Sequence, residues 1–226
     1  MTTGVKRVKP PVGSSPPRRT RRDVAAEATE RAIVDAALAL LRERGYTATT
    51  MEDLASAAGV AVQTIYNSIG GKRSVLSRVI DYVAAGPEAP TPVPSFMRER
   101  TASATSAQEI IGILGDWFVD SHQRMADVWP IVEQAAAVDP DVARLERVRA
   151  AQRFRNYREA AAAIARLGGL AGLDEPGAAA AIWTVSHPVV RRFLIADQAW
   201  SEDRYRTWLL ETLGRVLLAN PHSADH

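Results

Sequence analysis

Hydrophobic residues recur every three to four positions along most of this chain, which is the period of an α-helix with one buried face. The clearest stripe lies between residues 27 and 44, and the same spacing returns after Lys72 and through most of the second half. We expect helices over these approximate ranges: 27–44, 51–58, 62–68, 72–85, 106–128, 130–138, 140–167, 175–198 and 202–220. The pattern therefore predicts an all-α protein.

Glycine and proline divide these predicted helices. Gly45 is expected to end the first helix. The segment 86–94 contains four prolines and is predicted to be a linker, so we place a domain boundary there. Pro130 disfavours helix at the residue before it, which predicts a helix end near Val128. Pro188 interrupts a long hydrophobic stripe, so we expect a kink or break beside it.

Residues 50–68 have the signals of two short helices joined by a tight turn. Thr50 is a good N-cap because its hydroxyl can accept hydrogen bonds from the free N–H groups of the first helical turn. Gly59 can adopt the positive φ that ends a helix and redirects the chain. Val62, Ile65 and Ile69 then give the second helix an inward face. Such a pair is a helix-turn-helix, whose second helix can enter a DNA major groove.

The outward positions of that second helix suit contact with DNA. They are small or hydrogen-bonding, and none is acidic: Ala61, Gln63, Thr64, Tyr66 and Asn67. Glutamine and threonine can read base edges, whereas tyrosine and asparagine commonly bind phosphate oxygens. Lys72 opens the next helix, and a helix N-terminus beside a lysine is a good phosphate site. Thr49 and Thr50 are also expected near phosphate.

The stretch resembles the DNA-binding domain of TetR-type transcriptional regulators over residues 27–85. The matching residues are Gly45-Tyr46, Thr49-Thr50, Leu54-Ala55, Ala58-Gly59-Val60, Thr64-Ile65-Tyr66, Lys72 and Leu76. The chain departs from the family pattern at Ala61, where a serine cap is usual, at Ile69, where phenylalanine is usual, and at Gly70-Gly71, where a Pro-Ser-type pair is usual. These departures bear on loop geometry and base preference more than on the fold.

The resemblance implies a homodimer that binds a palindromic double-stranded DNA operator and releases it when a small-molecule effector binds. It also implies that the last two helices pair with their copies; alternatively, their hydrophobic stripes are only intramolecular core. The effector would bind among the large side chains of the second half of the chain: Trp117, Phe118, His122, Trp129, Phe154, Tyr157, Trp183 and His187. The competing interpretation is that these residues are ordinary core, because buried aromatic side chains usually pack.

Charge is distributed unevenly along the chain. The net charge is +2, but residues 1–23 hold seven basic residues and one acidic residue, so the arm carries 7 − 1 = +6 and the remainder 2 − 6 = −4. The arm is also rich in proline. It can follow phosphates or enter a minor groove, or it can be a solvated tail without defined contacts. An arginine-rich face is expected on the helix at 140–167, and a solvated surface is its simpler interpretation.

Catalytic chemistry is not predicted. The chain has no cysteine, and Ser186 and His187 are adjacent on a helix, so they do not face each other as a nucleophile and base would. Asp116 and Asp120 have no convincing third ligand for a metal. We therefore expect no enzyme, no cofactor and no metal site. No run of about 18 apolar residues is present, so we expect no membrane span and a cytoplasmic location.

The predicted organisation has five segments. They are a disordered, basic, proline-rich arm at 1–23, a helix-turn-helix domain with its linking helix at 24–86, a linker at 87–95, a helical ligand-binding and dimerisation domain at 96–220, and a tail at 221–226. The function predicted is that of a ligand-responsive transcriptional regulator, most often a repressor in this family. The alternative is a helical ligand-binding or scaffolding dimer that does not bind DNA specifically.

Overall fold

The computed structural model describes residues 20–86, 93–170 and 172–218, and every regular element in these ranges is helical. The elements are α1 (Arg21–Ala48), α2 (Met51–Ala58), α3 (Val62–Ser68), α4 (Lys72–Ala85), α5 (Val93–Ala102), α6 (Ala107–Arg124), α7 (Val128–Val138), α8 (Pro140–Arg166), α9 (Glu175–Val185), α10 (Pro188–Arg192), the π-helix η1 (Phe193–Asp197) and α11 (Glu202–Leu217). The all-α prediction is confirmed. Most of the predicted arm, the linker residues 87–92 and the tail 221–226 lie outside the described residues.

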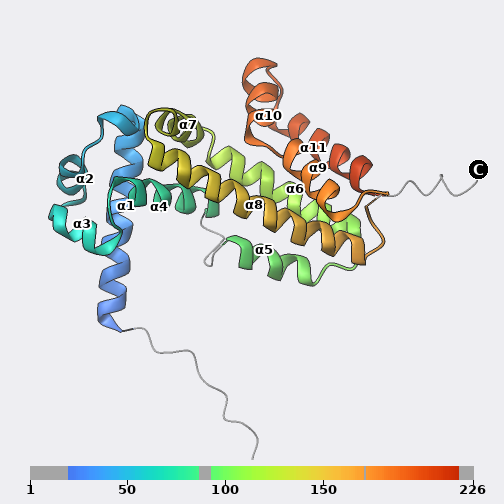
Figure 1. Cartoon of the computed structure of the whole chain (residues 1–226), viewed down its shortest axis with the longest axis horizontal. Coiled ribbons are helices and arrows are strands. Elements are labelled where there is room, and N and C mark those ends of the chain that lie inside the picture. Colours follow the sequence, from blue (N-terminus) through green and yellow to red (C-terminus); the bar gives the residue numbers. More distant parts are fainter. Residues whose placement is uncertain (1–19, 87–92, 171, 219–226) are drawn as a thin grey trace, which may run out of the picture.

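Helices α1 to α4 share one hydrophobic core with α7. Ile33 and Ala37 of α1, Ile65 of α3 and Val79 of α4 are fully buried in it. Val128, at the start of α7, is also fully buried in this cluster. Figure 1 shows α2 and α3 at one end of the molecule, with α1 and α4 between them and the remaining helices. The helix-turn-helix is therefore packed on a platform to which the second half of the chain contributes.

A second core joins α6, α8, α9 and α11. Residues that recur every four positions along α11 are fully or almost fully buried against the other three helices: Tyr205, Leu209, Leu213 and Leu217. Helix α8 contacts α4, α6, α7 and α9, and it runs from the α7 end of the molecule to the far end of the bundle (Figure 1). The same rigid helix thus touches both cores.

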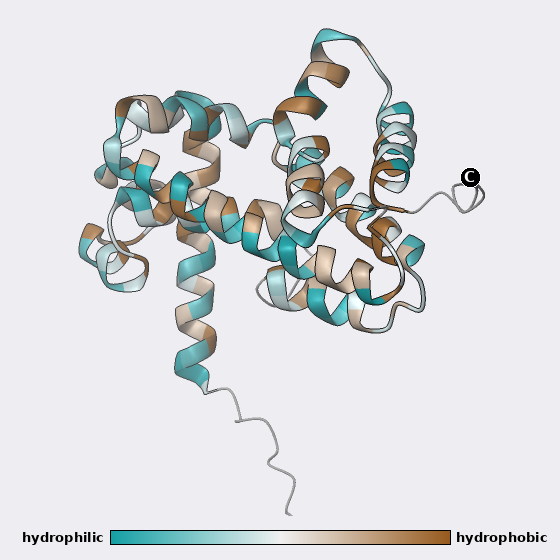
Figure 2. Cartoon of the chain, turned by 45° about the vertical axis from the view of Figure 1, so that its right-hand side comes forward, coloured by the Kyte–Doolittle hydropathy of each residue, from teal (hydrophilic) through white to brown (hydrophobic). Residues whose placement is uncertain are grey.

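The first helix begins earlier than the sequence predicts. Thr20 accepts a hydrogen bond from the Asp23 backbone N–H, and Asp23 accepts one from the Thr20 backbone N–H, which makes a reciprocal capping box. Arg21 and Arg22, which we had assigned to the arm, are therefore helical. Residues 21–28 are exposed, and these turns project from the rest of the molecule (Figure 2).

Three other predicted boundaries can be compared with the structure. Gly45 has φ of 76°, so the regular part of α1 ends there, as predicted. The prediction for Pro130 was wrong, because α6 stops at Arg124 and Pro130 lies in the first turn of α7. A proline is tolerated there because the first N–H groups of a helix have no intrahelical partner. Pro188 separates α9 from α10, as its position in the stripe predicts.

The start of α5 also differs from the expected linker. This helix begins at Val93, so residues 93–95, which were placed in the linker, are helical. None of its residues is fully buried, and it packs against α6. Within the described ranges, no helix is long and apolar enough to cross a lipid bilayer.

Candidate nucleic-acid interface and aromatic cluster

The turn between α2 and α3 has the geometry that its residues predict. Thr50 caps α2 in a second capping box, with its hydroxyl accepting from the Asp53 N–H at 3.0 Å. Gly59 ends α2 in the left-handed conformation, at φ 66° and ψ 32°, which a residue with a Cβ rarely adopts. The Val60 N–H then donates to the Ala55 carbonyl at 3.0 Å. These bonds fix the direction in which α3 leaves the turn.

Helix α3 buries Ile65 completely, packs Val62 against the same core and exposes most of its other side chains. Ile65 is fully buried and anchors the helix to the core. Gln63 and Asn67 are exposed, and the Gln63 amide donates to the Asn67 side chain at 2.9 Å. Tyr66 is 49% exposed, so much of its side chain faces solvent. Ala61 is exposed and gives the helix no side-chain cap, while Thr64 is half-buried at the edge of this face.

The two threonines before α2 have structural roles in the described chain. Thr49 is only 1% exposed, and its hydroxyl donates to the Gly45 carbonyl at 2.8 Å. The expectation that Thr49 lies near phosphate is therefore not supported, because its hydroxyl is inside the domain. The Thr50 hydroxyl is engaged with Asp53, but the residue is exposed.

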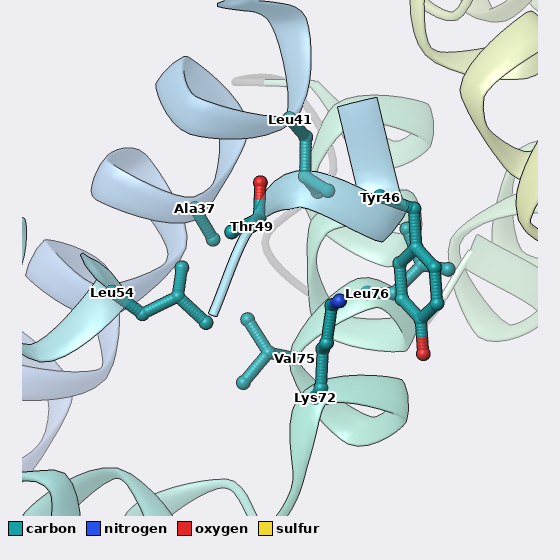
Figure 3. A pocket seen from close by; sticks show the side chains of 8 residues that line it. All are labelled: Ala37, Leu41, Tyr46, Thr49, Leu54, Lys72, Val75 and Leu76. Carbon is teal, nitrogen blue, oxygen red and sulfur yellow. The ribbon is translucent and has the colours of Figure 1, made fainter. Parts of the chain in front are cut away.

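Lys72 lies at the edge of the first core, beside the end of α1. Its ammonium group is 4.3 Å from the centre of the Tyr46 ring and 3.4 Å from the Thr47 carbonyl oxygen. Figure 3 shows the lysine amine facing that ring, at the edge of a cavity of only about 10 Å³. This cavity is too small for a ligand larger than water. The lysine is thus held at the N-terminus of α4 by an aromatic face and a carbonyl group.

The Tyr46 hydroxyl extends this contact into the second half of the chain. It donates to the Asp139 carboxylate at 2.9 Å, and Asp139 caps α8 by accepting from the Asp141 and Val142 N–H groups. The hydrogen bond from Tyr46 is the main cause of a lowered Asp139 pKa, whereas burial and the same bond raise the Tyr46 pKa. Burial lowers the Lys72 pKa, and the negative charge of Asp139 opposes this.

Helix α4 is held by further contacts from α6 and α8. Arg124 donates to the Val83 carbonyl at 3.1 Å and to the Ala84 carbonyl at 2.8 Å, so it caps the C-terminus of α4. Arg149 of α8 donates to Asp81 at 2.6 Å. A displacement of α6 or α8 would therefore act directly on the helix that begins with Lys72.

The DNA-binding end of the chain matches a known protein family. Residues 33–79 match the family described as "Bacterial regulatory proteins, tetR family", which covers the helix-turn-helix and most of α1 and α4. This part of the chain is a TetR-type DNA-binding domain. No curated protein matches the sequence significantly.

Solved structures agree with this TetR-type fold. Similar chains include NalD, the secondary repressor of the MexAB-OprM efflux pump in Pseudomonas aeruginosa, with a TM-score of 0.67, 19% identity and coverage of 85% of this chain and 98% of NalD. SmeT in complex with triclosan has a TM-score of 0.66, 20% identity and coverage of 86% and 93%. A protein from Saccharomonospora viridis, described as a transcriptional regulator and solved in complex with choline, has a TM-score of 0.64 and 16% identity. The match covers 86% of this chain and 100% of that protein. At these identities the likeness shows the fold alone.

Seven of the eight residues predicted to line an effector site form a continuous series of ring contacts. Phe118 stacks on His122 at 5.9 Å and meets Tyr157 edge-on at 5.6 Å. The centre of the Trp183 ring lies 6.0 Å from that of Tyr157, 6.3 Å from that of Phe154 and 5.5 Å from that of His187. Trp129 completes the series at 6.3 Å from His187. We call these seven residues the aromatic cluster. Trp117 lies apart from it, against Phe96 and Arg124.

Buried polar groups lie within and beside the aromatic cluster. The Nδ1 atom of His122 is buried without a hydrogen-bond partner in the described chain. Burial, followed by the charge of Arg191, lowers the His122 pKa to about 3, so its ring is neutral at pH 7. Arg191 is buried and paired with Glu202, beside the buried hydroxyl of Tyr205. In the sequence, the only signal for this pair is a charged residue, Arg191, within the predicted helix at 175–198.

Ser186 and His187 are not arranged as a catalytic pair. The Ser186 hydroxyl is buried and donates to the Ile182 carbonyl at 2.7 Å. The Nδ1 atom of His187 accepts a hydrogen bond from the Val189 N–H at 3.3 Å, which caps α10. The two residues lie at the break between α9 and α10, and both side chains are occupied by local helix geometry.

A surface groove of about 500 Å³ lies between α4 and α8. Its basic side chains face carboxylates of the same chain: Arg78 is 3.0 Å from Glu30, and Arg144 is 3.1 Å from Asp141. Because these charges are already paired and exposed, the groove does not indicate a particular ligand.

Proposed function

We propose that this TetR-type chain is a homodimeric transcriptional regulator, acting in the cytoplasm as a repressor that a small-molecule effector releases from a palindromic operator. The observation that carries the proposal is the outward face of α3, where Gln63, Tyr66 and Asn67 are exposed and no carboxylate is present. This face has hydrogen-bonding groups for base edges and phosphates and nothing that repels a phosphate backbone.

Lys72 and the first turn of α4 are proposed to hold a phosphate beside that face. No side chain caps the N-terminus of α4, so its first N–H groups can bind an anion. Lys72 adds a positive charge at the same place, and Tyr46 keeps it oriented. Contacts of this kind set the register of α3 on the duplex, whereas Gln63 and Thr64 are proposed to contribute sequence preference.

The dimer is proposed to form through α9 and α11. In the protomer, one stripe of α11 is already used in the core, but the neighbouring stripe of Trp208, Thr212 and Val216 is only half-buried. A two-fold pairing would cover that stripe and place two copies of α3 facing successive major grooves, about 34 Å apart.

The effector is proposed to bind in the aromatic cluster, whose rings come from α6, α7, α8, α9 and the N-cap of α10. Contacts from α6 and α8 to α4 give a route by which such binding changes the position of α3. By linkage, the effector must then weaken DNA binding by the same factor by which DNA weakens effector binding.

A fluorescence anisotropy titration tests the DNA part of the proposal. A labelled duplex from the chain's own promoter region is compared with a duplex of random sequence at the same salt concentration. We expect at least about a thousandfold preference for the promoter duplex. Equal affinity for both duplexes would favour the alternative of a ligand-binding or scaffolding dimer. Sedimentation equilibrium tests the dimer separately, and a protomer that stays monomeric at micromolar concentration contradicts it.

A further inference from the structure

Arg153 of α8 lies between two indole rings of the aromatic cluster. Its guanidinium carbon is 5.4 Å from the centre of the Trp129 ring and 5.5 Å from that of Trp183. His187 closes the arrangement, because its ring contacts both tryptophans. These four side chains, which we call the Arg153 box, come from α7, α8, α9 and the N-cap of α10.

The guanidinium of Arg153 has no acceptor within hydrogen-bonding distance among the described residues. The one described carboxylate within 4 Å is that of Glu146, at 3.9 Å, and this carboxylate also lies 3.7 Å from Arg149. A guanidinium has five N–H donors in a planar fork that fits a carboxylate. Among the described residues, these donors therefore have no closely placed carboxylate, and a carboxylate from solution can fit the fork.

Apart from Glu146 and Arg149, the groups beside Arg153 are mainly aromatic rings. Phe154 and Tyr157 continue the ring contacts from Trp183. Burial, followed by the charge of Arg153, lowers the His187 pKa, so this ring does not add a positive charge near neutral pH. The Arg153 side chain is 31% exposed, which gives its guanidinium edge access to solvent. An anion with an apolar body can reach this edge and lay that body against the indole rings.

We propose that the Arg153 box binds an organic anion, with a carboxylate on the Arg153 guanidinium and an apolar or aromatic body against Trp129 and Trp183. This inference rests on the proposed function and names the chemical class of its effector. Indole faces also attract cations. In this box, however, the Arg153 guanidinium already lies beside each indole ring, and a cationic ligand would meet its positive charge.

Three probes of the same shape and different charge test the proposal: benzoate, benzamide and benzamidinium. The measurement is the titration of the tryptophan side-chain N–H signals by NMR, on the full chain without DNA. We expect benzoate to shift the signals of Trp129 and Trp183 and to leave those of Trp200 and Trp208 in place. Benzoate should bind at least about tenfold more tightly than benzamide, because a charge-assisted bidentate contact is lost in the amide.

Variants of Arg153 identify the group responsible. Arg153→Gln should reduce benzoate affinity to that of benzamide, and Arg153→Lys should give an intermediate value because it keeps the charge and loses the fork. Arg158→Gln is the matched control, since Arg158 lies on the same helix and is exposed. Unchanged signals in the spectrum of each variant away from the box show that it is folded.

Several outcomes would overturn the inference. Benzamidinium binding as tightly as benzoate would show that the box takes cations or is indifferent to charge. Benzoate binding that survives Arg153→Gln would place the anion elsewhere. No shift with benzoate, in a protein that still prefers its promoter duplex in the anisotropy titration, would sink this inference and leave the regulator proposal intact. Shifts of the Trp129 and Trp183 signals with benzoate, in a protein without any duplex preference, would contradict the regulator proposal and leave the anion site intact.

Discussion

Replacing Lys72 by glutamine tests whether the N-terminus of α4 holds a phosphate. The substitution removes the charge that faces the Tyr46 ring 4.3 Å away and leaves a side chain of similar reach. Each phosphate contact contributes about 0.9 to the slope of log affinity against log salt concentration, so a dimer with two such contacts should lose about 1.8 from that slope.

The affinity change follows from the same slope. If the electrostatic contribution to binding vanishes near 1 M salt, one phosphate contact raises the DNA-binding constant by a factor of about 5.5 at about 0.15 M salt. Two contacts raise it by a factor of about 30. This corresponds to about 2 kcal/mol of binding free energy. The loss should be equal for the promoter duplex and for a random duplex, because a phosphate contact carries no sequence information.

The assay is the anisotropy titration at four or more salt concentrations, with Arg98→Gln as the control. Arg98 lies on α5, is exposed and pairs with Glu159, so its replacement removes one positive charge far from α3. Its slope should match that of the unaltered chain. A Lys72→Gln variant with an unchanged slope, or with an altered sequence preference, would show that the lysine does not act through a phosphate.

Three further changes have defined outcomes. Ile65→Ala should lower the free energy of unfolding by about 2–5 kcal/mol in urea titrations, because the fully buried side chain anchors α3; an effect as small as that of Gln63→Ala would contradict this role. The His122 pKa is about 3 in the folded chain and about 6.5 when unfolded, so stability is fully present above pH 6.5 and falls as the pH decreases, by about 2 kcal/mol between pH 7 and 5. His122→Phe should flatten that part of the profile, and an equally steep profile would disprove the assignment. Tyr46→Phe should raise the Asp139 pKa toward its ordinary value, measured by carboxyl NMR titration, and no change would mean that the hydroxyl bond is absent in solution.

Local signals predicted the helices well because their causes lie within a few residues. The period of the hydrophobic positions, the hydroxyl of Thr50 and the free φ of Gly59 act over one or two helical turns. The same is true of Pro188, which breaks its helix wherever that helix is placed. Pro130 misled the prediction because a proline is compatible with the first turn of a helix as well as with the end of one.

The candidate sites depended on tertiary packing to a greater degree. The outward face of α3 could be predicted, since a helix with Ile65 inward must turn Gln63 and Asn67 outward. The burial of Thr49 could not, because it depends on how the end of α1 packs against α2 and α4. A list of large side chains selected seven members of the aromatic cluster together with Trp117, and only the structure separated them.

The sequence by itself determined an all-helical chain with a helix-turn-helix, because short-range periods and caps specify both. Tertiary structure alone brought Tyr46 to Asp139, which lies 93 positions further along the chain, and placed Arg153 between two tryptophans. Such pairings depend on the angles at which whole helices pack, and these angles are set by the sum of many weak contacts across both cores.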